Sequence, residues 1–288
     1  MANKVRISAD STVDLSPELL ERYSIAVCPL AVTMGDQTLD DNGVDVHPAD
    51  LFEYTRRTGL LAKTAAQSTE YYADYFRKLT ADGSEVIHFT ISGSMSSALT
   101  FSCLAAEEVG NVRVVDSQNL STGIALLVIK AAEMVASGMD AESIVKEIEI
   151  LRPRVDASFV IDTLEFLHKG GRCSTVAMLG ANVLKLKPCI QVKNGAMDVG
   201  KKYRGKVESA FREYARDALH DPDDIDLSRV FVTHTCGHDA PIAREIAEEV
   251  RGILPFEEVL ITDAGCTVSA HCGPGTLGVL FIRKSDKK

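Results

Sequence analysis

Side chains that could hold an anion occur at four separate places in the chain, each near the end of a predicted strand or helix. Thr64 lies in AKTAAQS, Ser96 lies in a serine-rich turn, Arg172 follows Gly170-Gly171, and His271 precedes a Gly-Pro-Gly turn. Hydroxyl, guanidinium and imidazole groups all donate hydrogen bonds to carboxylates. Each group alone fits a cap, a turn or a surface charge. Because α/β proteins bind ligands at strand ends, the four together predict a binding site.

The serine-rich turn, TISGSMSSALT, lies between a predicted strand and a predicted helix. Its hydroxyls can cap the helix, or they can be offered to an anion at the helix N-terminus, where free N–H groups favour negative charge. Arg204, in KKYRG, is a fifth candidate for the same site.

The first half of the chain alternates β-like runs with helical patterns. Strands are predicted over 5–9, 25–34, 85–92 and 112–117, and helices over 16–23, 47–59, 69–83, 96–110, 122–138 and 140–155. This alternation is typical of a parallel sheet with helices on both faces. The region of Pro153 is the predicted boundary, which gives an N-terminal α/β domain over 1–153.

The second half, 154–288, reads as another α/β domain with a mixed sheet. Strands are predicted over 157–162, 229–235, 257–265 and 276–282, and helices over 163–171, 206–221 and 240–254. Residues 188–205 predict a β-hairpin with Asn194-Gly195 as its two-residue turn. The expected architecture is therefore two α/β lobes with a cleft between them.

Composition excludes several classes of protein. The 288 residues are 45% hydrophobic and 25% charged, with a net charge of −10, which does not attract nucleic acid. The N-terminus has no apolar segment of signal-peptide length, and no apolar run is long enough for a transmembrane helix. The seven cysteines are scattered without a C-x-x-C motif, so we expect reduced thiols in the cytoplasm.

Three alternative functions have weaker sequence support. GAMDVGK, residues 195–201, fits a phosphate-loop pattern but lacks the following Ser or Thr and lies on the predicted hairpin. His234, Cys236 and His238 in THTCGHD could share a face and hold a metal. A stand-alone hydrolase or acyltransferase could use Ser96 and His271, although G-x-S-x-G is absent.

Longer stretches of the sequence resemble the DegV family of bacterial fatty-acid-binding proteins, the lipid-carrying subunits of fatty acid kinase. The similar stretches cover nearly the whole chain: ISADSTVDLSPELLERYSIAVCPLAV, LDDNGVDVHPADLFEYTR, RVVDSQNLSTG, FVIDTLEFLHKGGRCS, LKLKPCIQVKNGAM and AHCGPGTLGVLF. The Leu-x-x-Leu-x-x-Gly-Gly-Arg and His-x-Gly-Pro-Gly motifs are the most specific, because they occur in the expected order and spacing.

The resemblance implies two α/β domains with a long-chain fatty acid in an apolar tunnel between them. It implies that the carboxylate is held by Thr64, Ser96, Arg172, Arg204 and His271, with no metal or other cofactor. The protein would be a carrier without catalytic activity, and a separate fatty acid kinase subunit would bind ATP and make the acyl phosphate. Because a fatty acid enters from a bilayer, we also expect transient contact with a membrane surface.

Two segments depart from the family pattern. TAAQS, residues 64–68, replaces Thr-Ser-Gln-Pro-Ser, and MSSAL, residues 95–99, replaces Leu-Ser-Gly-Thr-Tyr. Thr64 and Ser96 are retained, and the additional candidates for the headgroup site are Ser92, Ser94, Ser97 and Gly273. Gly273 is expected to shape the turn that presents His271. If His271 faces a carboxylate, its pKa should rise.

Overall fold

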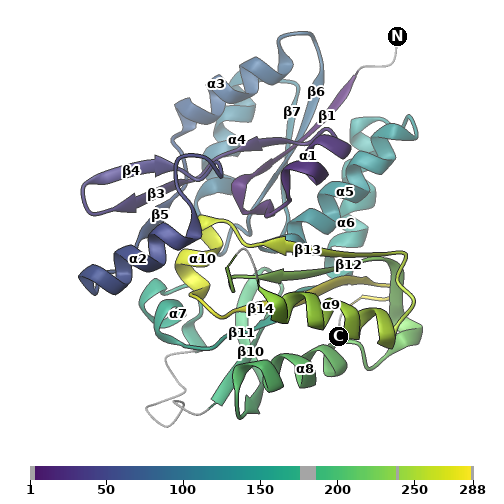
Figure 1. The fold of residues 1–288 in the computed structure, drawn as a ribbon. Helices are drawn as coiled ribbons and strands as arrows, with labels where there is room; N and C mark the ends of the chain where they lie inside the picture. Colours follow the sequence, from purple (N-terminus) through teal and green to yellow (C-terminus); the bar gives the residue numbers. More distant parts are fainter. Residues whose placement is uncertain (1–3, 176–185, 238–239, 287–288) are drawn as a thin grey trace.

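The structure is a computed structural model that describes residues 4–175, 186–237 and 240–286 (Figure 1). Strands assemble into a parallel sheet, a small antiparallel sheet and a mixed sheet. Within the described ranges, none of the helices combines the length and apolar character needed to cross a membrane.

A four-stranded parallel sheet, in the order β2-β1-β6-β7, forms the upper layer in Figure 1. Its strands are β1 (Val5–Asp10), β2 (Ala26–Cys28), β6 (Glu85–Thr90) and β7 (Val112–Asp116). Side chains of β6 alternate between the two faces, as a strand requires. Ile87 and Phe89 enter the main core, whereas His88 packs against Tyr72 and Phe76. The predicted N-terminal parallel sheet is confirmed.

Helices cover both faces of this sheet. One face packs against α3 (Thr69–Thr80) and α4 (Ala98–Val109), and the other against α5 (Thr122–Ala136) and α6 (Ala141–Leu151). The short helix α1 (Pro17–Arg22) follows β1. Helix α5 is buried on all sides from Thr122 to Ile129, because its far side contacts the mixed sheet. An apolar pattern around the whole helix is typical of such a sandwiched position.

A three-stranded antiparallel sheet, in the order β4-β3-β5, lies beside the parallel sheet. Its strands are β3 (Ala31–Met34), β4 (Gln37–Asp40) and β5 (Lys63–Ala65), and α2 (Pro48–Thr58) connects β4 to β5. The β-rich run over 25–34 forms two strands, β2 and β3, rather than one. The run is divided between two sheets at Pro29, which has no N–H group to donate to a strand ladder.

The mixed sheet has the order β11-β10-β9-β14-β12-β13, with β8 paired to β14. Its strands are β8 (Val155–Asp156), β9 (Ser158–Val160), β10 (Leu186–Lys193), β11 (Ala196–Arg204), β12 (Ile225–His234), β13 (Glu258–Asp263) and β14 (Leu277–Arg283). Helices α8 (Val207–Ala218) and α9 (Pro241–Ile253) cover its outer face. Lys193 pairs with Ala196 across Asn194-Gly195, so the predicted hairpin turn is confirmed.

Two short helices lie near the junction of the three sheets. Helix α7 (Glu165–Gly170) follows β9, and α10 (Cys266–Cys272) lies between β13 and β14. Figure 1 shows α10 between α2 and α7, and it contacts both. Helix α10 is missing from the sequence prediction, which gives strands over 257–265 and 276–282 and no element between them. It is the element that carries His271.

The predicted domain boundary at residue 153 coincides with a short 3₁₀ turn, η2 (Arg152–Arg154), between α6 and β8. The parallel and three-stranded sheets come from residues before it, and the mixed sheet comes from residues after it. The main hydrophobic core nevertheless combines residues from both parts, such as Ile87 and Phe231. The division into domains 1–153 and 154–288 therefore stays a proposal.

Candidate functional site

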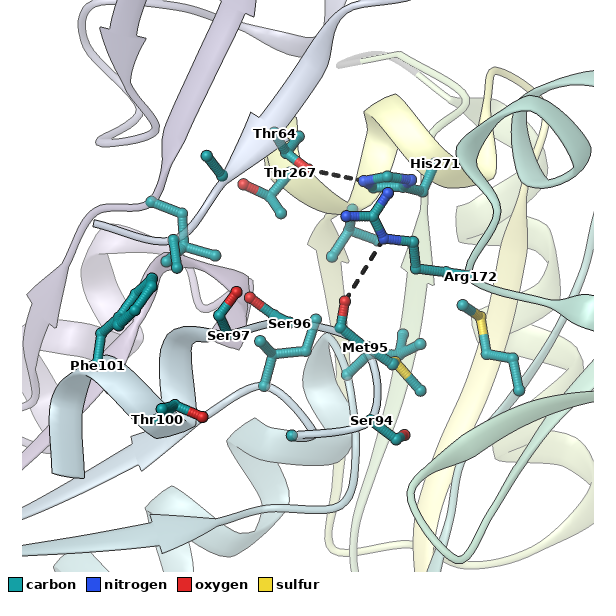
Figure 2. A pocket seen from close by; sticks show the side chains of 18 of the residues that line it. Thr64, Ser94, Met95, Ser96, Ser97, Thr100, Phe101, Arg172, Thr267 and His271 are labelled. Atoms are coloured by element: carbon teal, nitrogen blue, oxygen red, sulfur yellow. Dashed lines mark hydrogen bonds between the residues drawn. The ribbon is translucent and has the colours of Figure 1, made fainter. Parts of the chain in front are cut away.

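A cavity of about 590 Å³ lies where the two halves of the chain meet (Figure 2). Four of the five headgroup residues implied by the resemblance line it, namely Thr64, Ser96, Arg172 and His271. Ser94 and Ser97 line it as well. Much of the remaining wall is apolar, with side chains that include Leu30, Ile91, Phe101, Leu120, Met197 and Val268. The cavity therefore combines a polar region with apolar walls, as small-molecule sites do.

Thr64 and His271 form a hydrogen-bonded pair on one wall of the cavity. A distance of 2.7 Å separates Thr64 Oγ1 from His271 Nε2. Thr64 is on β5 and His271 is on α10, 207 residues later in the chain. Strand β5 packs against α10, so the three-stranded sheet brings the two side chains together. Figure 2 shows Arg172 directly beside this pair.

Burial keeps the His271 ring neutral in this environment. Loss of solvation, and then the nearby charge of Arg172, lower the pKa of His271 to about 4. Its Nδ1 atom is buried beside Gly170 and has no hydrogen-bond partner among the described residues. A Cβ atom on residue 170 would lie 2.6 Å from Nδ1, so glycine is needed for this close contact. The rise in the pKa of His271 that we expect from the sequence applies only when a carboxylate lies beside the ring. The negative charge of that carboxylate would act against the lowering by burial and by Arg172.

Arg172 is positioned by the end of helix α7, as the sequence predicted. The helix ends at Gly170, and Gly171 adopts the left-handed conformation with φ of 69°. Arg172 Nη1 donates to the Gly170 carbonyl at 2.8 Å, and Nε lies 3.5 Å from the Met95 carbonyl. No Asp or Glu within the described ranges forms an ion pair with Arg172. Its charge therefore remains available to an anion in the cavity.

In the serine turn, residues 92–97, most of the serine hydroxyl groups already form hydrogen bonds within the protein. Ser92 Oγ donates to the Gly195 carbonyl at 2.6 Å, and Ser94 Oγ donates to the same oxygen. These bonds fix the turn to the tip of the β10–β11 hairpin. Ser92 does not line the cavity, whereas Ser94 and Ser97 do. Ser96 Oγ accepts from the Ala98 N–H at 3.2 Å and so supports the start of α4.

The structure does not bring Arg204 into the lining of this cavity. Arg204 is exposed at the end of β11, where it pairs with Leu186 of β10. Gly273 does not line the cavity either, but it ends α10 with φ of 76°. A Cβ atom there would lie 2.5 Å from the Phe166 ring. Gly273 thus permits the tight turn after His271 through its conformation and its close contact with α7.

Sequence reasoning missed Thr267, which lies one helical turn before His271 on α10 and also lines the cavity. It also missed two carboxylates that hold this helix. Asp41 accepts the backbone N–H groups of Cys266 and Thr267 at 3.1 and 2.8 Å. Asp14 accepts the N–H of Gly265 at 2.8 Å. No local signal predicts these bonds, because both carboxylates come from the first 41 residues.

The described residues do not form a complete site for the hydrolase, the metal or the phosphate-loop alternative. His271 Nε2 bonds Thr64, and within the described part of the chain no hydrogen bond joins His271 to Ser96, as a hydrolase would require. His234 contacts Asp263 at 3.3 Å, whereas His238 lies outside the described residues. Among residues 4–175, 186–237 and 240–286, no group of three or more His, Cys, Asp or Glu is placed to hold a metal. GAMDVGK lies on the hairpin, as predicted.

Comparison with known sequences identifies the family of this chain. The model of the DegV family, described as uncharacterised proteins, matches residues 4–284. A DegV domain-containing protein from Deinococcus radiodurans is 30% identical over 279 residues, which are 96% of this chain and 97% of that protein.

Solved structures of similar proteins share the whole fold. A DegV family protein from Thermus thermophilus, described as binding fatty acid, has a TM-score of 0.86 at 29% identity and covers 97% of this chain and 99% of its own. A stearic acid-binding protein from Eubacterium ventriosum has a TM-score of 0.85 at 27% identity, covering 97% and 98%. DegV from Bacillus subtilis, a fatty acid binding protein, has a TM-score of 0.85 at 25% identity, covering 98% and 100%. This chain belongs to the DegV family.

Proposed function

We propose that this protein binds a long-chain fatty acid in the 590 Å³ cavity and presents its carboxylate to a separate kinase subunit, which forms the acyl phosphate. The observation that carries the proposal is the convergence of Thr64, Arg172 and His271 on one part of a cavity whose other walls are largely apolar. The similar proteins from Thermus thermophilus and Eubacterium ventriosum, which bind fatty acid and stearic acid, support it.

The carboxylate would be held by Arg172, Thr64, Ser96 and His271. A carboxylate that leaves water needs charge-assisted hydrogen bonds, and Arg172 supplies the positive charge. When the neutral His271 ring carries its proton on Nε2, it donates to Thr64 Oγ1. Thr64 then donates its own proton to a carboxylate oxygen. Arg204 stays a candidate for binding the headgroup only if the bound molecule extends beyond the residues that line the cavity.

The fatty acid tail would lie against the apolar walls. A small neighbouring cavity of about 20 Å³ shares Leu120, Val268 and Cys272 with the main one and offers a direction in which a longer tail could extend. Each buried methylene contributes about 0.8 kcal/mol. The tail would therefore supply most of the affinity, and the headgroup residues would supply the selection for a carboxylate.

Phosphorylation would be the task of the partner kinase subunit, with ATP bound there and with both proteins in the cytoplasm. This chain would act as a carrier rather than an enzyme. Delivery of the fatty acid would require brief contact with a membrane surface. Sedimentation with neutral vesicles tests that contact: we expect little pelleting, whereas stable, salt-resistant pelleting would contradict a transient encounter.

Mass spectrometry of the purified protein tests the binding itself. We expect about one free long-chain fatty acid per protein molecule, and long-chain esters should not be hydrolysed. Ester turnover without bound lipid would support the hydrolase alternative with Ser96 and His271. Incubation with an ATP-binding fatty acid kinase subunit then tests presentation: acyl phosphate should form from the bound lipid and be absent without either protein.

A further inference from the structure

A second, smaller cavity lies at the tip of the β10–β11 hairpin. Its volume is about 120 Å³, and it shares no lining residue with the 590 Å³ cavity. Three segments form its wall: the loop after β7, the η2 turn with the start of β8, and residues 192–195 of the hairpin. Because cavities for drug-sized molecules are usually about 300 Å³ or larger, this one suits a small ion or a compact polar group.

Two cationic side chains, Arg152 and Lys193, line this small cavity, and none of its lining residues is acidic. Within the described ranges, neither cation forms an ion pair. Arg152 is half-buried and donates from Nη1 to the backbone carbonyl of Asp116 at 3.0 Å, whereas Lys193 is exposed. The chain as a whole has a net charge of −10, so a cavity with two cations and no acid departs from its average. The two like charges repel each other, and a bound anion would offset that repulsion.

Neutral hydrogen-bond donors line the same cavity. The residues Gln118 and Asn194 both line it, and their side-chain amides form no hydrogen bond within the part of the chain that the structure describes. Both residues have φ of 50°, and Asn194 forms the hairpin turn with Gly195. Asn119 differs from them, because its Nδ2 already donates to the Ser117 carbonyl at 3.0 Å. The small cavity therefore offers charged and neutral donors without a competing carboxylate.

We propose that this small cavity binds a phosphate group, with Arg152 and Lys193 as its charged ligands and the amides of Gln118 and Asn194 as its neutral ones. A phosphate group close to a dianion at neutral pH matches the two positive charges and has acceptor oxygens for all four side chains. Nε and Nη2 of Arg152 are free for the two parallel N–H bonds that arginine makes to phosphate, and lysine binds as a point charge.

A phosphate group in this place would also hold the hairpin tip. Gly195 lines the small cavity, and its carbonyl accepts hydrogen bonds from Ser92 and Ser94 of the serine turn. Arg152 lies on η2, before the mixed sheet begins, and Lys193 lies at the end of β10. The anion would therefore bridge the two halves of the chain, and it should protect the hairpin tip from local opening.

An NMR titration of nitrogen-15-labelled protein with inorganic phosphate, at constant ionic strength, tests the proposal. We expect saturable shifts of the backbone amides of Gln118 and of residues 192–195, whereas potassium chloride should produce none. Lys193→Glu places an acid in the small cavity and should abolish these shifts. Lys78→Glu makes the same charge change at an exposed lysine of α3, so it is the matched control and should keep them.

Further variants locate the anion and identify its source. Arg152→Gln should weaken phosphate binding about tenfold, and Arg152→Lys, which keeps the charge, about threefold. Arg172→Ala removes the cation of the 590 Å³ cavity and should leave the phosphate affinity within about twofold of wild type. A parallel titration with glycerol 3-phosphate separates two sources of the group: tighter binding than inorganic phosphate identifies a phosphate ester, and equal or weaker binding identifies the free ion.

Several outcomes would overturn the phosphate site. These are the absence of saturable shifts with either compound, shifts that chloride reproduces, and shifts that persist in both Lys193→Glu and Arg152→Gln. Loss of the shifts in Arg172→Ala would also overturn it, because phosphate would then occupy the larger cavity. Lys193 is exposed and makes no side-chain hydrogen bond within the described ranges, so Lys193→Glu should fold. The site does not depend on the proposed function and would stand if palmitate did not bind.

Discussion

Two walls of the cavity carry similar polar residues but use them differently. The α10 wall is formed by Thr64, Thr267 and His271 with Arg172 beside them. Among the described residues, Arg172 has no acidic partner and the Thr267 hydroxyl has no hydrogen bond. In the serine turn, by contrast, Ser92 and Ser94 both donate to the Gly195 carbonyl. The type of residue does not separate the two walls. What separates Arg172 from Ser92 and Ser94 is whether the group is already paired, and this predicts ligand selection by Arg172 and structural support by the two serines, while Ser96 of the same turn stays a candidate for the headgroup.

The largest expected effect concerns Arg172. Arg172→Ala should fold but bind palmitate about 2–5 kcal/mol more weakly, because a buried carboxylate loses its charged partner. Thermal melting with and without palmitate measures this loss. Arg57→Ala, which removes an exposed arginine on α2, is the matched control and should keep the full palmitate-induced shift. An undiminished shift in Arg172→Ala would instead assign Arg172 to contact with the kinase, and phosphorylation should then be lost.

A smaller effect is expected from the protonation of His271. Its pKa is about 4 in the protein alone, and a carboxylate beside it should raise that value. The complex then binds more protons than the free protein, so palmitate affinity should rise as pH falls through the raised pKa and stay constant above it. Isotope-detected NMR of the histidine ring, with and without palmitate, measures both pKa values directly.

The variant His271→Gln is the control for this pH dependence, because it removes the titrating ring while retaining polar atoms. Its palmitate affinity should lack the part of the acid-side increase that comes from His271, and any remaining change reports titration of palmitate itself. An identical profile in wild type and variant would remove His271 from the headgroup site. Ester hydrolysis that increases with pH would favour the hydrolase alternative, in which a neutral His271 acts as a base toward Ser96.

The smallest effect is expected from Ser92, in the serine turn. Ser92→Ala removes a buried hydrogen bond to the hairpin tip and should lower the free energy of unfolding by about 1 kcal/mol. Urea denaturation measures that change. The ratio of palmitate to 1-hexadecanol affinity should remain close to that of wild type, since the bond does not distinguish headgroups. A strongly altered ratio would show that Ser92 also selects the ligand, and its contrast with Arg172 would disappear.

The sequence predicted the larger elements of the fold because their signals are local. Alternating strands and helices indicated the parallel sheet, and Asn194-Gly195 indicated the hairpin turn. Helix α10 has no such signal. It has only seven residues, begins after Gly265 without a side-chain cap, and is stabilised by Asp41, which lies 225 positions from Cys266. Capping by a residue so distant in sequence cannot be recognised from the segment itself.

The candidate site could be predicted in part. The family resemblance led to Thr64, Ser96, Arg172 and His271, and all four line one cavity. The resemblance did not distinguish these four residues from Arg204, which lies at the end of a strand. Nothing in the sequence around Arg204 indicates that its side chain is exposed. Thr267 was missed for a related reason. Its hydroxyl has no hydrogen-bond partner in the described part of the chain, and the partners of a buried hydroxyl depend on tertiary packing rather than on neighbouring residues.

The burial of α5 on all sides limits how the protein can open. One side of this helix packs on the parallel sheet and the other on the mixed sheet, so both sheets depend on the same apolar surface. A hinge motion that moved the sheets apart would expose that surface to water, at a cost comparable to unfolding. A ligand of the cavity would therefore have to enter while the two sheets remain fixed around the helix that they share.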